Sequence, residues 1–302
     1  MAKKILIFGG GGFVGGNLST IANQKGWQVS IAERSIKPGL EFATWTSVDI
    51  TNDFAVKESI HRINPDVVLN LAAMAAIDKA EQEREQTWAI NVNGAKNVAE
   101  YCEAGGIRHI YFSSDAVFDG EQDSYAEEAS PAPVNFYGQT KAEAEKAVLA
   151  THPKSVVIRI SLVLGFPVTG GNSFFAGLAA KLKTGAEIPA PKDEIRTPVD
   201  VITLSECVLE LAENDFFGIV HIGSTDSIDR FSLTRKIVQK MGYDEDIVVL
   251  SDKHEVQPDR APRHKNGIIE VAKAQGLLAT KLLCIDESIL CSFDDRIPPV
   301  EA

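Results

Sequence analysis

The chain has 302 residues, 44% of them hydrophobic, and its 30 basic and 42 acidic residues give a formal charge of -12. That charge repels a nucleic-acid backbone and an anionic membrane surface, so neither is an expected partner. No apolar run reaches the roughly 18 residues of a membrane span, and residues 1–4 lead directly into an apolar strand pattern, so we expect a cytoplasmic protein. The four cysteines are widely spaced, without histidines at ligand spacing, which favours reduced thiols and predicts no metal site.

Strand-like and helix-like segments alternate through the first half of the chain. Residues 91–102 have helical spacing of their apolar side chains, and the predicted strands are residues 4–8, 28–32, 66–71, 109–113 and 155–160. This βαβ rhythm predicts an α/β fold of the Rossmann type, with a doubly wound parallel sheet. The rhythm breaks in the glycine- and proline-bearing stretch 165–172. We therefore expect a sheet domain over residues 1–165 and a smaller C-terminal region over 166–302, with 197–225 returning to the sheet through a strand at 218–223.

A glycine-rich run at residues 9–16 directly follows the first predicted strand and leads into a helix. It fits two spacings, Gly9-x-x-Gly12-x-x-Gly15 and Gly10-x-Gly12-x-x-Gly15. Glycines let the backbone turn sharply and approach a pyrophosphate, while the helix N-terminus offers free N–H groups and a partial positive charge. Glycine runs are often simple flexible turns, but the placement between strand and helix indicates a dinucleotide site.

The second predicted strand ends in Glu33 and Arg34. An acidic residue at this place holds the adenosine ribose hydroxyls and argues for NAD, whereas an arginine holds a 2′-phosphate and argues for NADP. Both cofactors stay open, and a solvated surface pair is an equally good interpretation of the two charges. Asp49 ends a further strand-like stretch, where it could meet the adenine amino group.

Tyr137 and Lys141 stand four residues apart in the helix-like stretch 135–148 and so share one helix face. Such a lysine, joined in the holoenzyme by an oxidised nicotinamide ring, favours tyrosinate and should lower the pKa of the phenol toward neutrality. The spacing occurs by chance in many helices, but after a dinucleotide turn it marks the leading catalytic candidate. Ser114 follows the strand 109–113 and could hydrogen-bond a substrate oxygen, the alternative being a serine that satisfies its own turn.

These features together resemble the extended short-chain dehydrogenase/reductase superfamily. The resemblance rests on the glycine turn, on Asn91 in Ile-Asn-Val-Asn-Gly, on Ser113-Ser-Asp-Ala-Val-Phe-Asp-Gly120 and on residues 133–141. Within that superfamily, residues 64–73 and 77–81 are similar to the dTDP-4-dehydrorhamnose reductase-like branch, which also includes the regulatory β subunit of methionine adenosyltransferase. The likeness covers most of residues 3–165 and returns at 196–201 and 218–222.

The resemblance implies an NAD(P)-dependent reductase of a keto sugar, in particular a nucleotide-linked 4-keto-6-deoxysugar. Ser114 would polarise the carbonyl, Tyr137 would protonate it, and Lys141 would hold the nicotinamide ribose and tune Tyr137. Predicted substrate contacts are Met74, Asp115, Ala116, Val117 and Arg196. Besides Tyr137 and Lys141, the predicted cofactor contacts are Gly9, Gly12, Phe13, Val14, Gly15, Glu33, Arg34, Asp49, Ile50, Leu71, Ala72, Ala73 and Asn91.

Two positions depart from the usual reductase pattern. Ala116 stands where a tyrosine is usual, and Met74-Ala75 where the reductases carry His-Thr. A sugar-nucleotide 4-epimerase suits Ser114 equally well, and a cofactor-binding regulatory subunit without turnover is the alternative of another class. A homodimer is compatible with the sequence. A nucleotide diphosphate would need cations after residue 165, and Arg196 is the preferred candidate among Lys181, Lys183, Arg196, Arg260 and Arg263.

Overall fold

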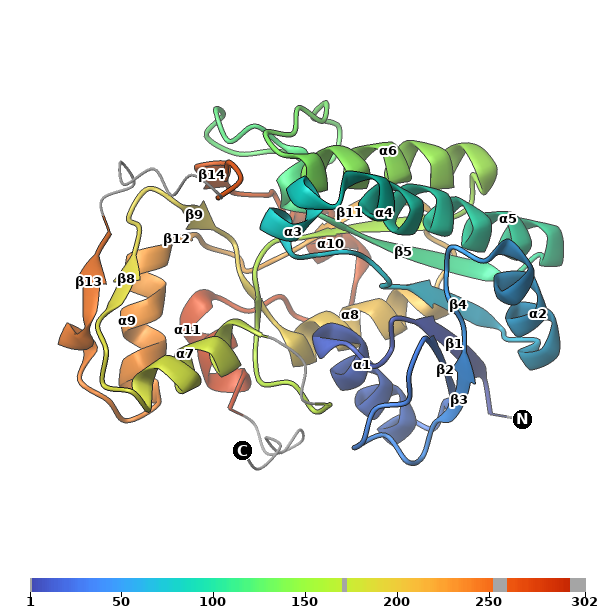
Figure 1. Ribbon diagram of the computed structural model, residues 1–302, viewed down its shortest axis with the longest axis horizontal. Helices are drawn as coiled ribbons and strands as arrows, with labels where there is room; N and C mark the ends of the chain where they lie inside the picture. Colours follow the sequence, from blue (N-terminus) through green and yellow to red (C-terminus); the bar gives the residue numbers. More distant parts are fainter. Residues whose placement is uncertain (1, 170–172, 252–259, 294–302) are drawn as a thin grey trace.

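A parallel sheet forms the centre of the computed structural model, which describes residues 2–169, 173–251 and 260–293 (Figure 1). Within these residues the sheet has seven strands in the order β11-β6-β5-β4-β1-β2-β3. Their bounds are β1 Lys4–Phe8, β2 Gln28–Glu33, β3 Thr44–Ser47, β4 Val67–Asn70, β5 Arg108–Ser114, β6 Val156–Ile160 and β11 Gly218–Ile222. Strands β2 and β4 lie on opposite sides of β1, so the strand order reverses there. This is the switch point of a doubly wound sheet. The predicted Rossmann-type fold is confirmed.

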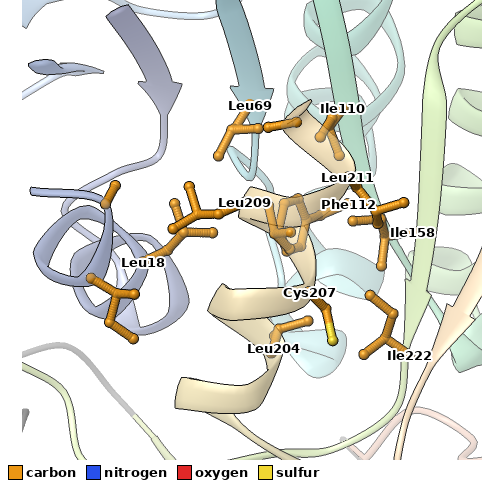
Figure 2. Packing of buried hydrophobic residues seen from close by; sticks show 14 of the residues in the cluster. Leu18, Leu69, Ile110, Phe112, Ile158, Leu204, Cys207, Leu209, Leu211 and Ile222 are labelled. Carbon is orange, nitrogen blue, oxygen red and sulfur yellow. The ribbon is translucent and has the colours of Figure 1, made fainter. Parts of the chain in front are cut away.

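Helices cover both faces of this sheet, which is why its central strands β1 and β4 are apolar on both faces. Helices α1 (Phe13–Gln24) and α8 (Val201–Glu213) pack on the face that receives Ile5 and Ile7, and Figure 2 shows Leu18 and Leu204 in this core. The opposite face receives Leu6 and Phe8. It is covered by α2 (Asp53–Ile63), α5 (Ala95–Gly105) and α6 (Phe136–Thr151).

The helix predicted from residue 91 starts differently in the structure. Residues Ala89–Gly94 form a π-helix that continues into α5, and α3 (Ile77–Gln82) and α4 (Arg84–Trp88) precede it. A π-turn inserts an extra residue into the helix and frequently marks a functional site. It leaves Asn91 on the buried side, against the loop that follows β4.

Residues after β6 build a smaller unit at the left of Figure 1. Its own core packs α7 (Phe174–Leu182), α9 (Arg230–Lys240) and α11 (Ile285–Cys291) against β8 (Ile188–Ala190) and β13 (Val248–Leu250). A second small sheet joins β12 (Ile228–Asp229), β9 (Ile195–Arg196) and β14 (Asn266–Gly267). The remaining elements are the strands β7 (Val163–Leu164) and β10 (Val199–Asp200), the helix α10 (Ala272–Leu277), and two 3-10 turns, η2 (Asp115–Val117) and η3 (Glu245–Ile247).

The division between the two units is less simple than a cut at residue 165. Strand β11 pairs with β6, so this later segment rejoins the sheet. Val271, Ala274 and Leu278 also belong to the core of the large sheet, although they follow the smaller unit in the chain. The crossing stretch 165–172 is described only to residue 169, and Thr169 Oγ1 donates to the carbonyl of Gly11 at 2.8 Å. None of the helices in the described part of the chain combines the length and apolarity of a membrane span.

Candidate active site and dinucleotide site

A cavity of about 440 Å³ opens at the carboxyl ends of β1, β2, β3 and β4, beside the switch point of the sheet. Open α/β sheets bind their ligands at this place. The predicted residues that line it are Gly9, Gly12, Glu33, Arg34, Asp49, Ile50, Leu71, Ala72, Ala73 and Met74. The sequence missed further lining residues from α3, α4 and the π-helix, including Lys79, Gln86 and Ile90, because nothing in their local pattern links them to the strand ends.

The glycine turn has the shape that a pyrophosphate requires. Gly9 has φ +78°, and a Cβ there would lie 2.8 Å from the backbone nitrogen of Ala72. A Cβ on Gly15 would overlap the carbonyl oxygen of Gly9. Helix α1 begins at Phe13 after Gly12, which has no side chain to cap it, so the first N–H groups face the turn. This cradle fits a dinucleotide, although Phe13, Val14 and Gly15 lie in the first turn of the helix and do not line the cavity.

Glu33 and Arg34 differ sharply in their surroundings. The Glu33 carboxylate accepts the N–H of Gly11 at 2.7 Å, so it lies against the glycine turn, whereas Arg34 is exposed. Asp49 accepts both the N–H and the hydroxyl of Thr51, at 2.9 and 2.7 Å, and these bonds lower the pKa of Asp49. Asp49 therefore stabilises its own turn through these hydrogen bonds, and it also lines the cavity.

The structure brings Ser114, Tyr137 and Lys141 together. Ser114 ends β5, and Tyr137 and Lys141 lie in the first two turns of α6. Asn135 caps that helix by accepting the N–H of Gly138 at 2.8 Å. A Cβ at Gly138 would overlap the carbonyl oxygen of Ala116, so the glycine lets the start of α6 lie directly against the chain that follows Ser114. The hydroxyl of Ser114 is close enough to the phenol of Tyr137 to act on its pKa.

The pKa of Tyr137 is raised in the protein alone. Burial raises it, the hydroxyl of Ser114 partly opposes burial, and the charge of Asp115 adds to the rise, so that the pKa of Tyr137 is about 12. The Lys141 ammonium donates to the carbonyl of Phe112 and lies 4.4 Å from the ring centroid of Tyr111. Burial lowers the pKa of Lys141 to about 7. In the protein alone, loss of water dominates the pKa of the phenol, and the lysine is directed at a carbonyl group. The expectation of an acidified phenol concerns the holoenzyme and stays a prediction.

Asn91 is buried and does not line the cavity, contrary to the prediction of a direct cofactor contact. Its Oδ1 accepts the N–H of Met74 at 2.7 Å, and its Nδ2 donates to Thr140 Oγ1 at 2.9 Å. Asn91 thus positions one wall of the cavity relative to the helix that carries Lys141.

Several predicted substrate contacts have other roles. Val117 is fully buried in a small core with Phe118 and Ile269, so its side chain cannot reach a substrate. Ala116 is 3% exposed. The expectation for these two positions was wrong, because the turn after β5 points them into the protein.

Asp115, after β5, and Arg196, on β9, form an ion pair that joins the two units. Arg196 donates to the carbonyls of Ile195, Lys265 and His264 at 2.7, 2.8 and 3.0 Å, and its Nε lies 3.5 Å from Asp115. Those donors are therefore unavailable to a diphosphate, and Arg196 was wrongly predicted as the substrate cation. Burial alone would raise the pKa of Asp115, but His264, Arg196 and the hydroxyl of Ser161 hold it at about 2.

A second cavity of about 260 Å³ lies in the smaller unit and contains an arginine that the sequence analysis missed. The guanidinium carbon of Arg230 lies 3.7 Å from the ring centroid of Phe174, and Arg260 and Lys181 also line this cavity. Burial lowers the pKa of Arg230 to about 10, so its side chain stays cationic at neutral pH. Arg230 follows Asp229 at the start of an ordinary amphipathic helix, and no local signal distinguishes it.

The family model for the RmlD substrate binding domain matches residues 3–290. The chain belongs to this family. It is 33% identical to dTDP-4-dehydrorhamnose reductase of Mycolicibacterium smegmatis over 87% of this chain and 76% of that protein. It is 34% identical to methionine adenosyltransferase 2 subunit beta of Pongo abelii, over 54% of this chain and 48% of that one.

The fold of this RmlD-family chain also matches a solved structure of dTDP-4-dehydrorhamnose reductase from Bacillus anthracis in complex with NADP. The TM-score is 0.86 at 26% identity, covering 97% of this chain and 99% of the other. The resemblance to the extended short-chain dehydrogenase/reductases is thereby confirmed, and the chain is an NAD(P)-dependent oxidoreductase of that type.

Proposed function

We propose that this enzyme reduces the keto group of a nucleotide-linked 4-keto-6-deoxysugar, as its dTDP-4-dehydrorhamnose reductase relatives are named for doing. The observation that carries the proposal is the placement of Ser114 at the end of β5 against the start of α6, which bears Tyr137 and Lys141, in a chain whose glycine turn fits a dinucleotide. A nicotinamide cofactor supplies the hydride when bound. The protein's own task is then to place the carbonyl and to give its oxygen a proton.

Tyr137 is suited to donating that proton. Its raised pKa keeps the phenol protonated until negative charge develops on the substrate oxygen. The Ser114 hydroxyl accepts the N–H of Ala116 and donates to Asp115, both at 3.2 Å. If its proton turns from Asp115 to the substrate, it gives the same oxygen a second hydrogen bond. Lys141, one turn along the helix from Tyr137, would hold the nicotinamide ribose.

The second cavity supports a nucleotide-linked sugar. Arg230 and Arg260 provide cations for a diphosphate, and Phe174 provides an aromatic face for a base. The elements that carry the two sites are in contact, because β12 pairs Ile228 with Arg196 and Arg196 contacts Asp115, the residue after Ser114. In this proposal the substrate places its sugar at Tyr137 and its nucleotide near Arg230.

The similarity to reductases supports reduction over epimerisation. The family model covers residues 3–290, and relatives that match most of the chain are named as dTDP-4-dehydrorhamnose reductases. A regulatory subunit without turnover is less favoured, because the similarity to methionine adenosyltransferase 2 subunit beta covers a smaller part of the chain than the reductase similarity does.

The test is to incubate the protein with dTDP-4-keto-6-deoxysugar and either NADH or NADPH. Reduction predicts one dinucleotide oxidised for each sugar reduced. Inversion at C4 without net loss of dinucleotide would instead indicate an epimerase. Dinucleotide binding without oxidation by any keto sugar, together with a copurifying partner enzyme, would support the regulatory alternative.

A further inference from the structure

A buried ion pair lies directly behind the catalytic helix. Arg159 stands in the otherwise apolar strand β6, and its Nε and Nη2 donate to the two carboxylate oxygens of Glu145 at 2.9 and 2.7 Å. The two residues are 1% and 3% exposed. An arginine within Val-Val-Ile-Arg-Ile is a visible signal, since charged side chains are almost never fully buried without a partner.

Glu145 joins the elements that bear the three catalytic candidates. It lies one turn after Lys141 on α6, so the two side chains share a helix face. The hydroxyl of Ser113, the residue before Ser114 on β5, donates to the same carboxylate oxygen as Arg159 Nε. One carboxylate therefore ties α6 to β5 and, through Arg159, to β6.

Further hydrogen bonds connect this pair from β6 to β11. Arg159 Nη1 donates to the carbonyl of Glu127 at 3.2 Å, and the Glu127 carboxylate accepts the N–H of His221 on β11 at 3.0 Å. All of these groups have partners on a different strand or loop. The guanidinium is thus fixed on several sides and holds Glu145 in one position.

Glu145 is also placed to balance the buried Lys141 ammonium. The titratable and charged groups packed around Lys141 are Tyr137 and Glu145 on its own helix, Tyr111 on β5 and, behind Glu145, Arg159 on β6. Burial favours the neutral amine, and the charge of Glu145 opposes it. The charge of Asp115, in the turn after β5, raises the pKa of Tyr137 instead.

We propose that Glu145 and Arg159 form a positioning pair for the reaction, which fixes the Tyr137–Lys141 helix against the Ser114 strand and holds the Glu145 carboxylate one turn from Lys141, where it favours the ammonium form. Stability alone is a poor explanation for such a pair, because buried ion pairs often stabilise a fold no more than apolar residues of equal volume. The role in catalysis rests on the proposed reductase function, whereas the effect on Lys141 does not.

Two single variants should shift the pKa of Lys141 in opposite directions. Glu145→Gln removes the negative charge, so the pKa of Lys141 should fall by about one unit. Arg159→Met leaves the full charge of Glu145 facing Lys141, so that pKa should rise. Loss of packing alone would not produce shifts of opposite sign. Glu143→Gln is the matched control, since Glu143 pairs with Lys146 on the exposed side of the same helix and should change neither value.

The first measurement is the NMR titration of lysine side chains labelled at Cε, with the Lys141 signal assigned by its absence in Lys141→Arg. This needs no substrate, so it decides the effect on Lys141 even if no keto sugar is reduced and the proposed function fails. The second is the pH profile of kcat/KM for reduction. The alkaline pH at which kcat/KM falls should be lower in Glu145→Gln and higher in Arg159→Met than in the wild type.

Thermal unfolding establishes that each variant is folded. If a single variant leaves a buried charge and does not fold, Glu145→Gln combined with Arg159→Met removes both charges, and the pKa of Lys141 should still fall because Glu145 is the nearer group. Glu145→Asp keeps the charge and should retain the wild-type titration. The proposal is overturned if folded variants, single or double, titrate at Lys141 as the wild type does, or if both single variants shift in the same direction.

Discussion

The side-chain amide of Asn91 hydrogen-bonds both the N–H and the carbonyl of Met74. Its Oδ1 accepts the N–H of Met74 at 2.7 Å, and its Nδ2 lies 3.3 Å from the Met74 carbonyl. The same Nδ2 donates to Thr140, the residue before Lys141. A buried amide in the π-helix thus links the cavity wall to the catalytic helix without facing the cavity itself.

Asn91→Ala should weaken dinucleotide binding about tenfold, because the loss of one or two buried hydrogen bonds, each contributing about 1 kcal/mol, frees the loop after β4. Fluorescence titration with NADH measures the affinity. Asn93→Ala changes an exposed residue of the same π-helix and serves as the control. Equal affinities in the two variants would show that Asn91 does not position the cavity wall.

Tyr137→Phe should lower kcat at least about a hundredfold and leave the dinucleotide affinity nearly unchanged, because it removes a proton that is needed only in the transition state. Steady-state kinetics with the keto sugar and a separate NADH titration give the two values. Tyr243→Phe, at an exposed tyrosine, should match the wild type. If Tyr137→Phe kept most of its activity, another group would have to be the proton donor.

Asp115 should make folding stability depend on pH in the acid range. Its pKa in the folded protein, about 2, is below its ordinary value of 3.8, so the fold favours the ionised carboxylate. The resulting stabilisation is complete above the ordinary value and is lost as the pH falls from about 4 to about 2.

Urea unfolding of the wild type and Asp115→Asn tests this dependence. The difference in free energy of unfolding between the two proteins should be larger at neutral pH than at pH values near the folded pKa. Asp123→Asn, at an exposed aspartate, is the control. A difference that does not change with pH would mean that Asp115 is not stabilised as an ion.

Glu33→Gln should raise the ratio of kcat/KM for NADPH to that for NADH about tenfold, equivalent to about 1.4 kcal/mol. It removes a negative charge from the cavity wall at the end of β2, where a 2′-phosphate would lie in the proposed dinucleotide site. Arg34→Gln removes the neighbouring cation and should lower the same ratio. Initial rates with the two dinucleotides give the comparison. An unchanged ratio in both variants would place the preference elsewhere.

The order of strands and helices could be predicted from the sequence because it depends on local patterns. Apolar runs bounded by turn residues located β1, β2, β4, β5 and β6 to within a residue or two of their observed bounds. The glycine turn, and the four-residue spacing of Tyr137 and Lys141, were readable for the same reason: the strand and helix periods dictate which end and which face each residue occupies. These patterns were sufficient for the fold and for the proximity of Ser114, Tyr137 and Lys141, whose catalytic roles stay a proposal.

What each residue does at its position was decided by segments that are distant in the chain. The carbonyls of His264 and Lys265 accept the hydrogen bonds of Arg196, and the carboxylate of Glu127 accepts the N–H of His221. Burial by the surrounding chain raises the pKa of Tyr137. Loss of water and the choice of hydrogen-bond partners depend on everything that packs around a group. The sequence by itself therefore determined where the chemistry is located, and only the tertiary structure decided its protonation states and which charges are free.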